Sequence, residues 1–169
     1  MGNVKIKWEH ELRYTLILLQ EGSLNSWRGD ESAKTPSDYE RACDIDDYIG
    51  IIKSGGRDVL VFGDMPMLLG WKNVDPSTLI IYRWISAENI EEISKELEKI
   101  DISIFESVSN EIDVVDNNLI IMEAAQTGVE GQITGSKATL IPGKYSVFTE
   151  EYHPNKETHF ILHLLKRKN

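Results

Sequence analysis

Short apolar runs, separated by turn-forming residues, recur along the whole chain. They are rich in β-branched and aromatic side chains, and runs of this length and composition are typical of β-strands. The final run is also compatible with a short helix, and we favour the strand. Together the runs predict strands at about 13–20, 48–53, 58–62, 79–85, 102–107, 111–115, 118–123, 137–141, 144–150 and 158–165.

Two glycine-containing turns predict hairpins between neighbouring strands. Residues 54–57 read Ser-Gly-Gly-Arg, and glycine adopts the positive φ of a tight hairpin turn at little cost. Residues 141–144 read Ile-Pro-Gly-Lys, the order that a type II turn prefers. The polar or proline-containing stretches 31–38 and 72–78 are predicted to be connections.

One segment has helical rather than strand periodicity. Its apolar residues are spaced three, four and three apart, which places them on one face of an α-helix. Ser86 is a suitable N-cap, and the acidic residues that follow it suit the positive end of the helix dipole. The helix is predicted at about 87–100, with an apolar face made of Ile90, Ile93, Leu97 and Ile100.

These elements predict a mostly β (α+β) protein of antiparallel strands and hairpins with one principal helix. A length of 169 residues suits a single domain, residues 1–169. The strands fall on both sides of the helix. A second arrangement therefore stays open, in which β-rich halves at about 1–86 and 117–169 are joined by the helix-containing segment.

The overall charge limits the kinds of partner. The net charge is −10 and the isoelectric point is near 4.9, which argues against binding nucleic-acid phosphates or an anionic membrane. No apolar run approaches the ~20 residues that span a bilayer, and the N-terminus lacks the apolar core of a signal peptide. The single Cys43 fits a reducing compartment. We therefore expect a cytoplasmic protein, for which basic partners are electrostatically favourable.

Acidic residues are concentrated in two segments. Residues 88–116 contain ten acids and two lysines, a net charge of −8, and residues 38–47 contain five acids and one arginine, a net charge of −4. Such runs are often the solvated faces of surface elements. The alternative is a surface that attracts and holds a basic protein.

Enzyme motifs are missing from the sequence. There is no glycine-rich phosphate loop and no nucleophile elbow, and Cys43 has no neighbouring histidine to activate it. The sequence therefore gives no reason to expect catalysis.

Metal ligands do not form a recognisable pattern either. On a strand, His159 and His163 share a face but lie about 13 Å apart at ~3.3 Å per residue, too far to share one ion. Asp44, Asp46 and Asp47 lack the glycine and terminal glutamate of an EF-hand loop. No metal site is predicted.

Tryptophans offer a different kind of contact. Trp27 and Trp71 lie beside glycines in predicted turns, where they either close the ends of the core or anchor an interface. On the strand at 79–85, Arg83 and Trp84 point to opposite faces. Trp84 is predicted to be buried, and Arg83 to pair on the other face with Asp38 or Asp64.

An ordered set of motifs resembles the immunity protein 21 family of bacterial polymorphic toxin systems. In chain order the motifs are W-R-G (27–29), S-D-Y-E-R-A-C (37–43), D-D-Y-I-G-I-I (46–52), V-L-V-F-G-D-M-P (59–66), Y-R-W (82–84), L-I-P-G-K-Y-S-V (140–147) and L-H-L-L (162–165). The resemblance implies a mostly β protein that is encoded beside a toxin and protects its producer by binding that toxin. It implies no catalysis and no cofactor.

Combining the resemblance with the charge gives a hypothesis for the partner surface. The partner is expected to be a cognate toxin domain, with a basic nuclease as one candidate. The candidate contact residues are Glu91, Glu92, Glu96, Glu98, Asp44, Asp46, Asp47, Trp27 and Trp71. The alternative is a small-molecule-binding or enzymatic β domain with a site near Asp38, Asp64 and Arg83.

Overall fold

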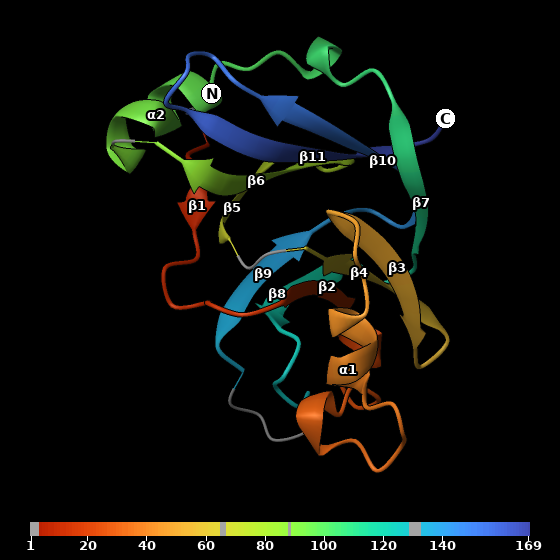
Figure 1. The fold of residues 1–169 in the computed structure, drawn as a ribbon. Coiled ribbons are helices and arrows are strands. Elements are labelled where there is room, and N and C mark those ends of the chain that lie inside the picture. Colours follow the sequence, from red (N-terminus) through yellow and green to blue (C-terminus); the bar gives the residue numbers. More distant parts are fainter. Residues whose placement is uncertain (1–3, 65–66, 88, 129–132) are drawn as a thin grey trace.

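Two antiparallel sheets are stacked face to face in the computed structural model, which describes residues 4–64, 67–87, 89–128 and 133–169 (Figure 1). The six-stranded sheet has the order β1-β5-β6-β11-β10-β7 and the five-stranded sheet the order β3-β4-β2-β8-β9. This confirms the mostly β class. The first sheet comprises β1 (Lys7–Trp8), β5 (Leu68–Asp75), β6 (Thr78–Ser86), β7 (Val108–Val114), β10 (Gly143–Tyr152) and β11 (His159–Arg167), and the second β2 (Leu16–Gln20), β3 (Ile49–Ser54), β4 (Arg57–Phe62), β8 (Asn118–Glu123) and β9 (Gly135–Thr139).

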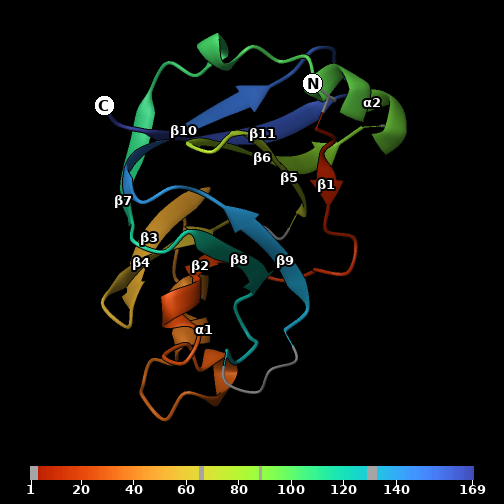
Figure 2. The same cartoon turned by 180° about the vertical axis from the view of Figure 1, so that it is seen from behind.

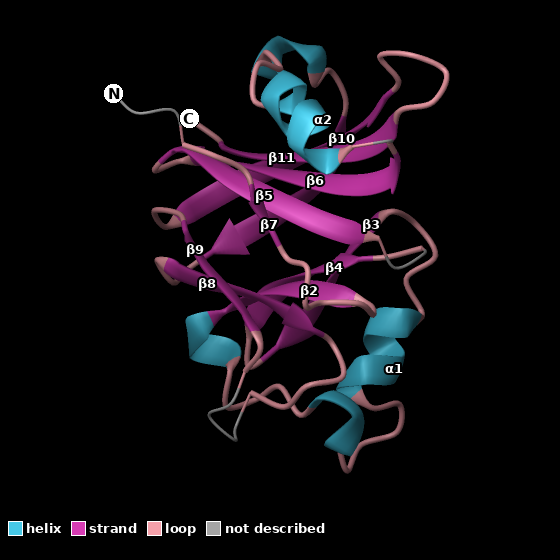
Figure 3. Ribbon diagram, turned by 90° about the vertical axis from the view of Figure 1, so that its left-hand side faces the viewer, coloured by secondary structure: helices cyan, strands magenta, loops and turns pink. Residues whose placement is uncertain are grey.

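The core consists of three apolar layers, and Figure 3 shows the two stacked sheets with α2 and α1 on their outer sides. The central layer lies between the sheets and includes Leu18, Leu60 and Ile81. Helix α2 (Ile90–Leu97) covers the outer face of the six-stranded sheet, and helix α1 (Asp38–Cys43) with the segment before it covers the outer face of the five-stranded sheet. A strand that is buried on both faces has a continuous run of apolar residues in its sequence. Such runs are what predicted these strands.

Helix α2 forms where the periodicity predicted it, but it is shorter than 87–100. Its N-cap is Asn89, whose side chain accepts hydrogen bonds from the backbone N–H groups of Glu91 (2.9 Å) and Glu92 (3.4 Å). Ser86, the predicted cap, is instead the last residue of β6, and its hydroxyl donates to the carbonyl of Glu157 (3.0 Å). Glu88 lies outside the described residues.

Helix α1 was not predicted, although its start carries a clear signal. Ser37 and Glu40 form a capping box, in which each side chain accepts a hydrogen bond from the backbone N–H of the other residue. The interpretation of residues 31–38 as a plain connection therefore missed the start of a short helix.

Two other predictions about elements were wrong. Strand β5 continues through most of the predicted connection at 72–78, because its polar residues pair with β6 at the edge of the sheet. The predicted strand at 102–107 begins instead with a 3-10 turn, Ile102–Ile104. Asp101 caps this turn by accepting from the N–H of Ser103 (2.9 Å).

One of the two predicted hairpins is confirmed. Gly55 and Gly56, both at positive φ, join β3 to β4. The Pro-Gly segment does not join β9 to β10 as a hairpin, because β9 pairs with β8 whereas β10 pairs with β7 and β11. The chain instead crosses there from the five-stranded sheet to the six-stranded one (Figure 2).

Both sheets combine strands from before and after α2. The final apolar run is a strand, β11, as predicted, and it pairs with β6 and β10 near the centre of its sheet. None of the helices in the described part of the chain is long and apolar enough to cross a membrane.

Candidate functional site

The acidic residues of α2 face solvent because the apolar ones face the sheet. Ile93 and Leu97 are buried against the six-stranded sheet, whereas Glu91, Glu92 and Glu96 are exposed. This is the amphipathic pattern expected of a surface helix. Three of the predicted contact residues therefore belong to one short helix, and a fourth, Glu98, is its C-cap.

Glu98 differs from the other three glutamates. It is half-buried, and its carboxylate accepts from the backbone N–H of Ile6 (3.4 Å). Its backbone carbonyl accepts from the Lys72 ammonium group (3.4 Å). Glu98 therefore attaches the N-terminal segment and β5 to the end of α2, a structural task that leaves it less available to a partner.

An acidic cleft lies between α2 and the loop that joins β10 to β11. Its volume is about 200 Å³. Glu92 and Glu96, one helical turn apart, form one wall, and Glu157 from the loop contributes a third carboxylate. No basic side chain is among the described residues that line it, which are Ala87, Asn89, Glu92, Ile93, Glu96, Asn155, Glu157 and Thr158.

Hydrogen bonds fix the loop side of this cleft. The Asn155 side chain accepts from the backbone N–H groups of Glu157 (2.9 Å) and Thr158 (3.0 Å). Ser86 in turn donates to the Glu157 carbonyl. A fixed cleft with three carboxylates can accept a lysine or arginine side chain with little loss of its own conformational freedom.

Asp44, Asp46 and Asp47 are also exposed, in the segment between α1 and β3. They lie on the side of the five-stranded sheet, whereas the α2 cleft belongs to the six-stranded one. The next residue, Tyr48, donates a hydrogen bond from its hydroxyl to Glu151 of β10 (3.4 Å). The β10–β11 hairpin therefore lies beside both acidic segments. Its Glu151 contacts Tyr48, which follows Asp47, and its loop forms one side of the cleft at α2.

The tryptophans named in the sequence analysis are part of the packing. Trp27 is fully buried, and its indole N–H donates to the carbonyl of Ala124 (3.0 Å), so its side chain does not face a partner. Trp71 is half-buried against the central layer and donates to the Glu9 carboxylate (2.9 Å). Both side chains therefore contribute to packing, Trp27 completely and Trp71 in part.

The faces of Arg83 and Trp84 are the reverse of the prediction. Arg83 is 2% exposed and lies between the sheets, where its guanidinium donates to the carbonyls of Tyr48 and Gly63 (2.7 Å each). Trp84 points to the other face and packs half-buried in the layer under α2. Apolar residues line both faces of β6, so alternation could not distinguish the two.

Burial also governs the charge on Arg83. Removal from water lowers the pKa of its guanidinium to about 10, and the carboxylate of Asp64 opposes that shift. The Phe62 ring lies 5.9 Å away, within cation–π range. Arg83 therefore stays charged at neutral pH and ties β6 to segments that flank β3 and β4.

The structure does not assemble the alternative site at Asp38, Asp64 and Arg83. Asp38 lies at the start of α1, where it pairs with Arg41 (3.1 Å) and accepts from the backbone N–H of Arg28 (2.8 Å). Of the proposed trio only Asp64 and Arg83 interact electrostatically. Asp38 therefore stabilises α1 rather than a site around Arg83.

The two histidines of β11 have different surroundings. His163 is fully buried, with its Nδ1 2.9 Å from the hydroxyl of Thr149. His159 instead stacks on His153, beside Glu151, at the end of the β10–β11 hairpin. The signal was present in the sequence, since a Glu-X-His pair directly follows the predicted strand at 144–150 and a histidine is the second residue of the next predicted strand.

Comparison with protein-family models identifies one match to this chain. A model described as Immunity protein 21 matches residues 8–158 of the 169. Comparisons with curated proteins and with solved structures give no match. The matched region contains both helices and every described strand except β11 and the first residue of β1, so it covers most of both sheets.

Proposed function

Because the chain belongs to the immunity protein 21 family, we propose that it binds one cognate bacterial toxin domain and neutralises it by stoichiometric protein–protein interaction. The family match over residues 8–158 is the observation that carries this proposal. Immunity protein families are generally non-enzymatic, so inhibition is achieved by occupying the toxin. The proposed place of action is the cytoplasm, where the producing cell needs protection.

The α2 cleft is the proposed contact for a basic group of the toxin. Glu92, Glu96 and Glu157 converge on it, and charged side chains arranged in this way accelerate association with an oppositely charged partner. A nuclease is the favoured class of toxin, because a protein that binds nucleic-acid phosphates carries a basic surface. An acidic protein seated on that surface excludes the nucleic acid.

Co-expression with the toxin tests the function directly. The toxin domain encoded beside this gene is expressed in a bacterial host with and without the full chain, and survival is counted. We expect the chain to restore growth, and the purified proteins to form a complex of fixed stoichiometry in analytical ultracentrifugation.

A toxin from an unrelated locus serves as the control and should not be neutralised. If the chain neither protects against the adjacent toxin nor forms a complex with it, the proposed function is wrong. Nuclease activity of the purified toxin, and its loss in the complex, separately tests the proposed toxin class.

A further inference from the structure

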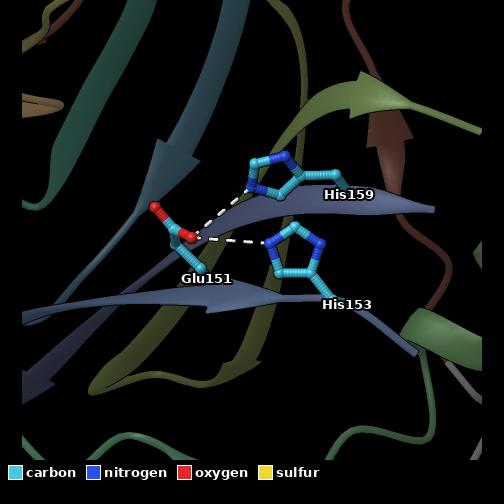
Figure 4. A group of neighbouring side chains, drawn as sticks. All are labelled: Glu151, His153 and His159. Atoms are coloured by element: carbon cyan, nitrogen blue, oxygen red, sulfur yellow. Dashed lines mark hydrogen bonds and ion pairs between the residues drawn. The ribbon is translucent and has the colours of Figure 1, made fainter. Parts of the chain in front are cut away.

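A carboxylate and two imidazoles converge at the end of the β10–β11 hairpin (Figure 4). The carboxylate Oε2 of Glu151 lies 3.4 Å from Nε2 of His153 and 3.7 Å from Nε2 of His159. One ligand atom from each residue lies within 4.8 Å of the other two. The β-hairpin creates this grouping, because Glu151 and His153 point to the same side of one strand end and His159 begins the strand beside it.

Hydrogen bonding accounts for only one of the two histidines. Nε2 of His153 makes a long hydrogen bond with Oε2 of Glu151 (3.4 Å), whereas the 3.7 Å between Oε2 and Nε2 of His159 exceeds hydrogen-bond length. Nε2 of His159 is buried and has no hydrogen-bond partner among the described residues. A buried polar atom of this kind normally has a partner, so its position at the centre of the group requires an explanation.

The two rings stack with centroids 3.8 Å apart and planes inclined by 27°. The stack holds both rings beside Glu151, and each neutral imidazole offers the nitrogen lone pair that a metal ion requires.

The two separations between the carboxylate oxygen and the ring nitrogens are close to those around a small metal ion. Ligand atoms ~2.0–2.2 Å from Zn²⁺ at tetrahedral angles are about 3.3–3.6 Å from one another. The Glu151–His153 distance falls in this range. The Glu151–His159 distance is slightly longer, and a small movement of the exposed Glu151 carboxylate brings it into the range. Two histidines and one carboxylate are a ligand set that zinc and non-haem iron both use.

A neighbouring side chain orients the carboxylate. The Tyr48 hydroxyl donates to Oε1 of Glu151 (3.4 Å), which leaves Oε2 turned toward the two histidines. Outer contacts of this kind commonly fix the orientation of metal ligands. Glu151 and His153 are half-exposed at 52% and 50%, so an ion can reach the group from solvent.

We propose that Glu151, His153 and His159 form a binding site for one divalent transition-metal ion of the zinc class. Three protein ligands leave a fourth position for water or for a donor from another molecule. The site lies on the opposite face of the six-stranded sheet from α2, because Phe160 and Leu162 of β11 face the helix whereas His159 does not. The proposal does not depend on the identity of the toxin.

Calorimetric titration with Zn²⁺ tests the site. The full chain is prepared without a histidine tag, treated with a chelator, dialysed, and titrated with zinc chloride. We expect uptake of one ion per chain. Glu151→Gln, His153→Ala and His159→Ala should each weaken binding by at least about tenfold, since even outer-shell partners of a metal are typically worth 10–100-fold.

His10→Ala is the matched control, because His10 is exposed and lies in the segment between β1 and β2. It should bind zinc as the parent does. Circular dichroism of the metal-free variants checks folding, and the visible spectrum of the Co²⁺-loaded parent reports nitrogen and oxygen ligands independently. The proposal is overturned if the parent takes up no stoichiometric ion, or if the three ligand variants bind zinc as tightly as the parent.

Discussion

At the scale of single residues, Arg83 shows what sequence periodicity leaves undetermined. Alternation places Arg83 and Trp84 on opposite faces of β6, and the structure confirms this. Alternation does not reveal which of the two residues faces the other sheet, since both faces of β6 are apolar. The guanidinium of Arg83 donates to two carbonyls, those of Tyr48 and Gly63, that come from elsewhere in the chain and that the pattern of β6 does not reveal.

Replacing Arg83 should therefore cost stability. Arg83→Met keeps the length of the side chain but removes both guanidinium donors. The Tyr48 carbonyl keeps the backbone N–H of Gly63 as a donor (3.0 Å), whereas the Gly63 carbonyl loses the donor that Arg83 supplies. An unsatisfied buried polar group costs about 1–3 kcal/mol, so the free energy of unfolding should fall by about that amount in urea titrations. Arg13→Met, at an exposed position, is the control and should stay within about 0.5 kcal/mol of the parent. An equal effect of the two substitutions would contradict the role assigned to Arg83.

His163 should make stability depend on pH. The ring is fully buried beside Thr149, Phe62 and the charge of Arg83, and burial, reinforced by Arg83, holds its pKa well below 6.5. The unfolded chain thus binds a proton near pH 6.5 that the folded chain does not. Stability is complete above that pH and falls below it, by at most about 1.4 kcal/mol per pH unit for this one group.

Substituting His163→Gln tests this dependence. The variant should lose stability less steeply than the parent between pH 6.5 and pH 5, measured by urea unfolding at each pH. Its absolute stability at pH 7.5 is a separate quantity, because the new side chain packs differently. Identical slopes in the two proteins would show that His163 does not carry the effect.

At the scale of elements, the strength of the local pattern determined what could be predicted. The helical period of α2 and the glycine turn between β3 and β4 are local signals, and both are confirmed. β10 pairs with β7, which precedes β8 and β9 in the chain, and with β11 rather than with β9, so the Pro-Gly turn gave a wrong hairpin. Likewise, the α2 cleft needs Glu157 from a distant loop, which no helix pattern reveals.

The proposed role of the α2 cleft can be tested by charge reversal. The double variant Glu92→Lys/Glu96→Lys should bind the toxin at least about tenfold more slowly at low salt, because a steering charge is reversed. The difference from the parent should shrink as salt rises, since the Debye length falls from ~10 Å at 0.1 M to ~3 Å at 1 M. Stopped-flow association and cell survival are the measurements.

A matched control separates the cleft from overall charge. Glu11→Lys/Glu31→Lys makes the same change in net charge at exposed positions outside the cleft and should retain most of the association rate. Thermal unfolding should show both double variants folded, because exposed charges contribute little to stability. If the two variants slow association equally, the cleft is not the contact, and Asp44, Asp46 and Asp47 become the next candidates.

At the scale of the whole molecule, each sheet is built from strands that lie far apart along the chain. The five-stranded sheet places β2 between β4 and β8, and the six-stranded sheet places β6 beside β11. The sequence predicted most of the strands and the class, but it contained no local signal for this interleaving, because many pairing partners lie far apart along the chain. Whether the chain unfolds as one unit or as two halves is therefore decided by measurement.

We expect a single cooperative unfolding transition. Each sheet needs strands from both sides of α2, so neither 1–86 nor 117–169 alone contains a complete sheet. Far-ultraviolet circular dichroism and tryptophan fluorescence should give coincident urea curves, since Trp27 and Trp84 report on different layers of one structure. Two separated transitions would favour independent halves.

The central position of β2 also affects when the protein can fold during synthesis. Leu18 in the middle of that strand pairs with Ile121, about a hundred residues later in the chain. Such long-range pairing makes folding slow, because the loop must close before its contacts form. A ribosome must therefore release most of the polypeptide before the five-stranded sheet can close, and a truncated nascent chain exposes the apolar faces of β2 and β4 in the meantime.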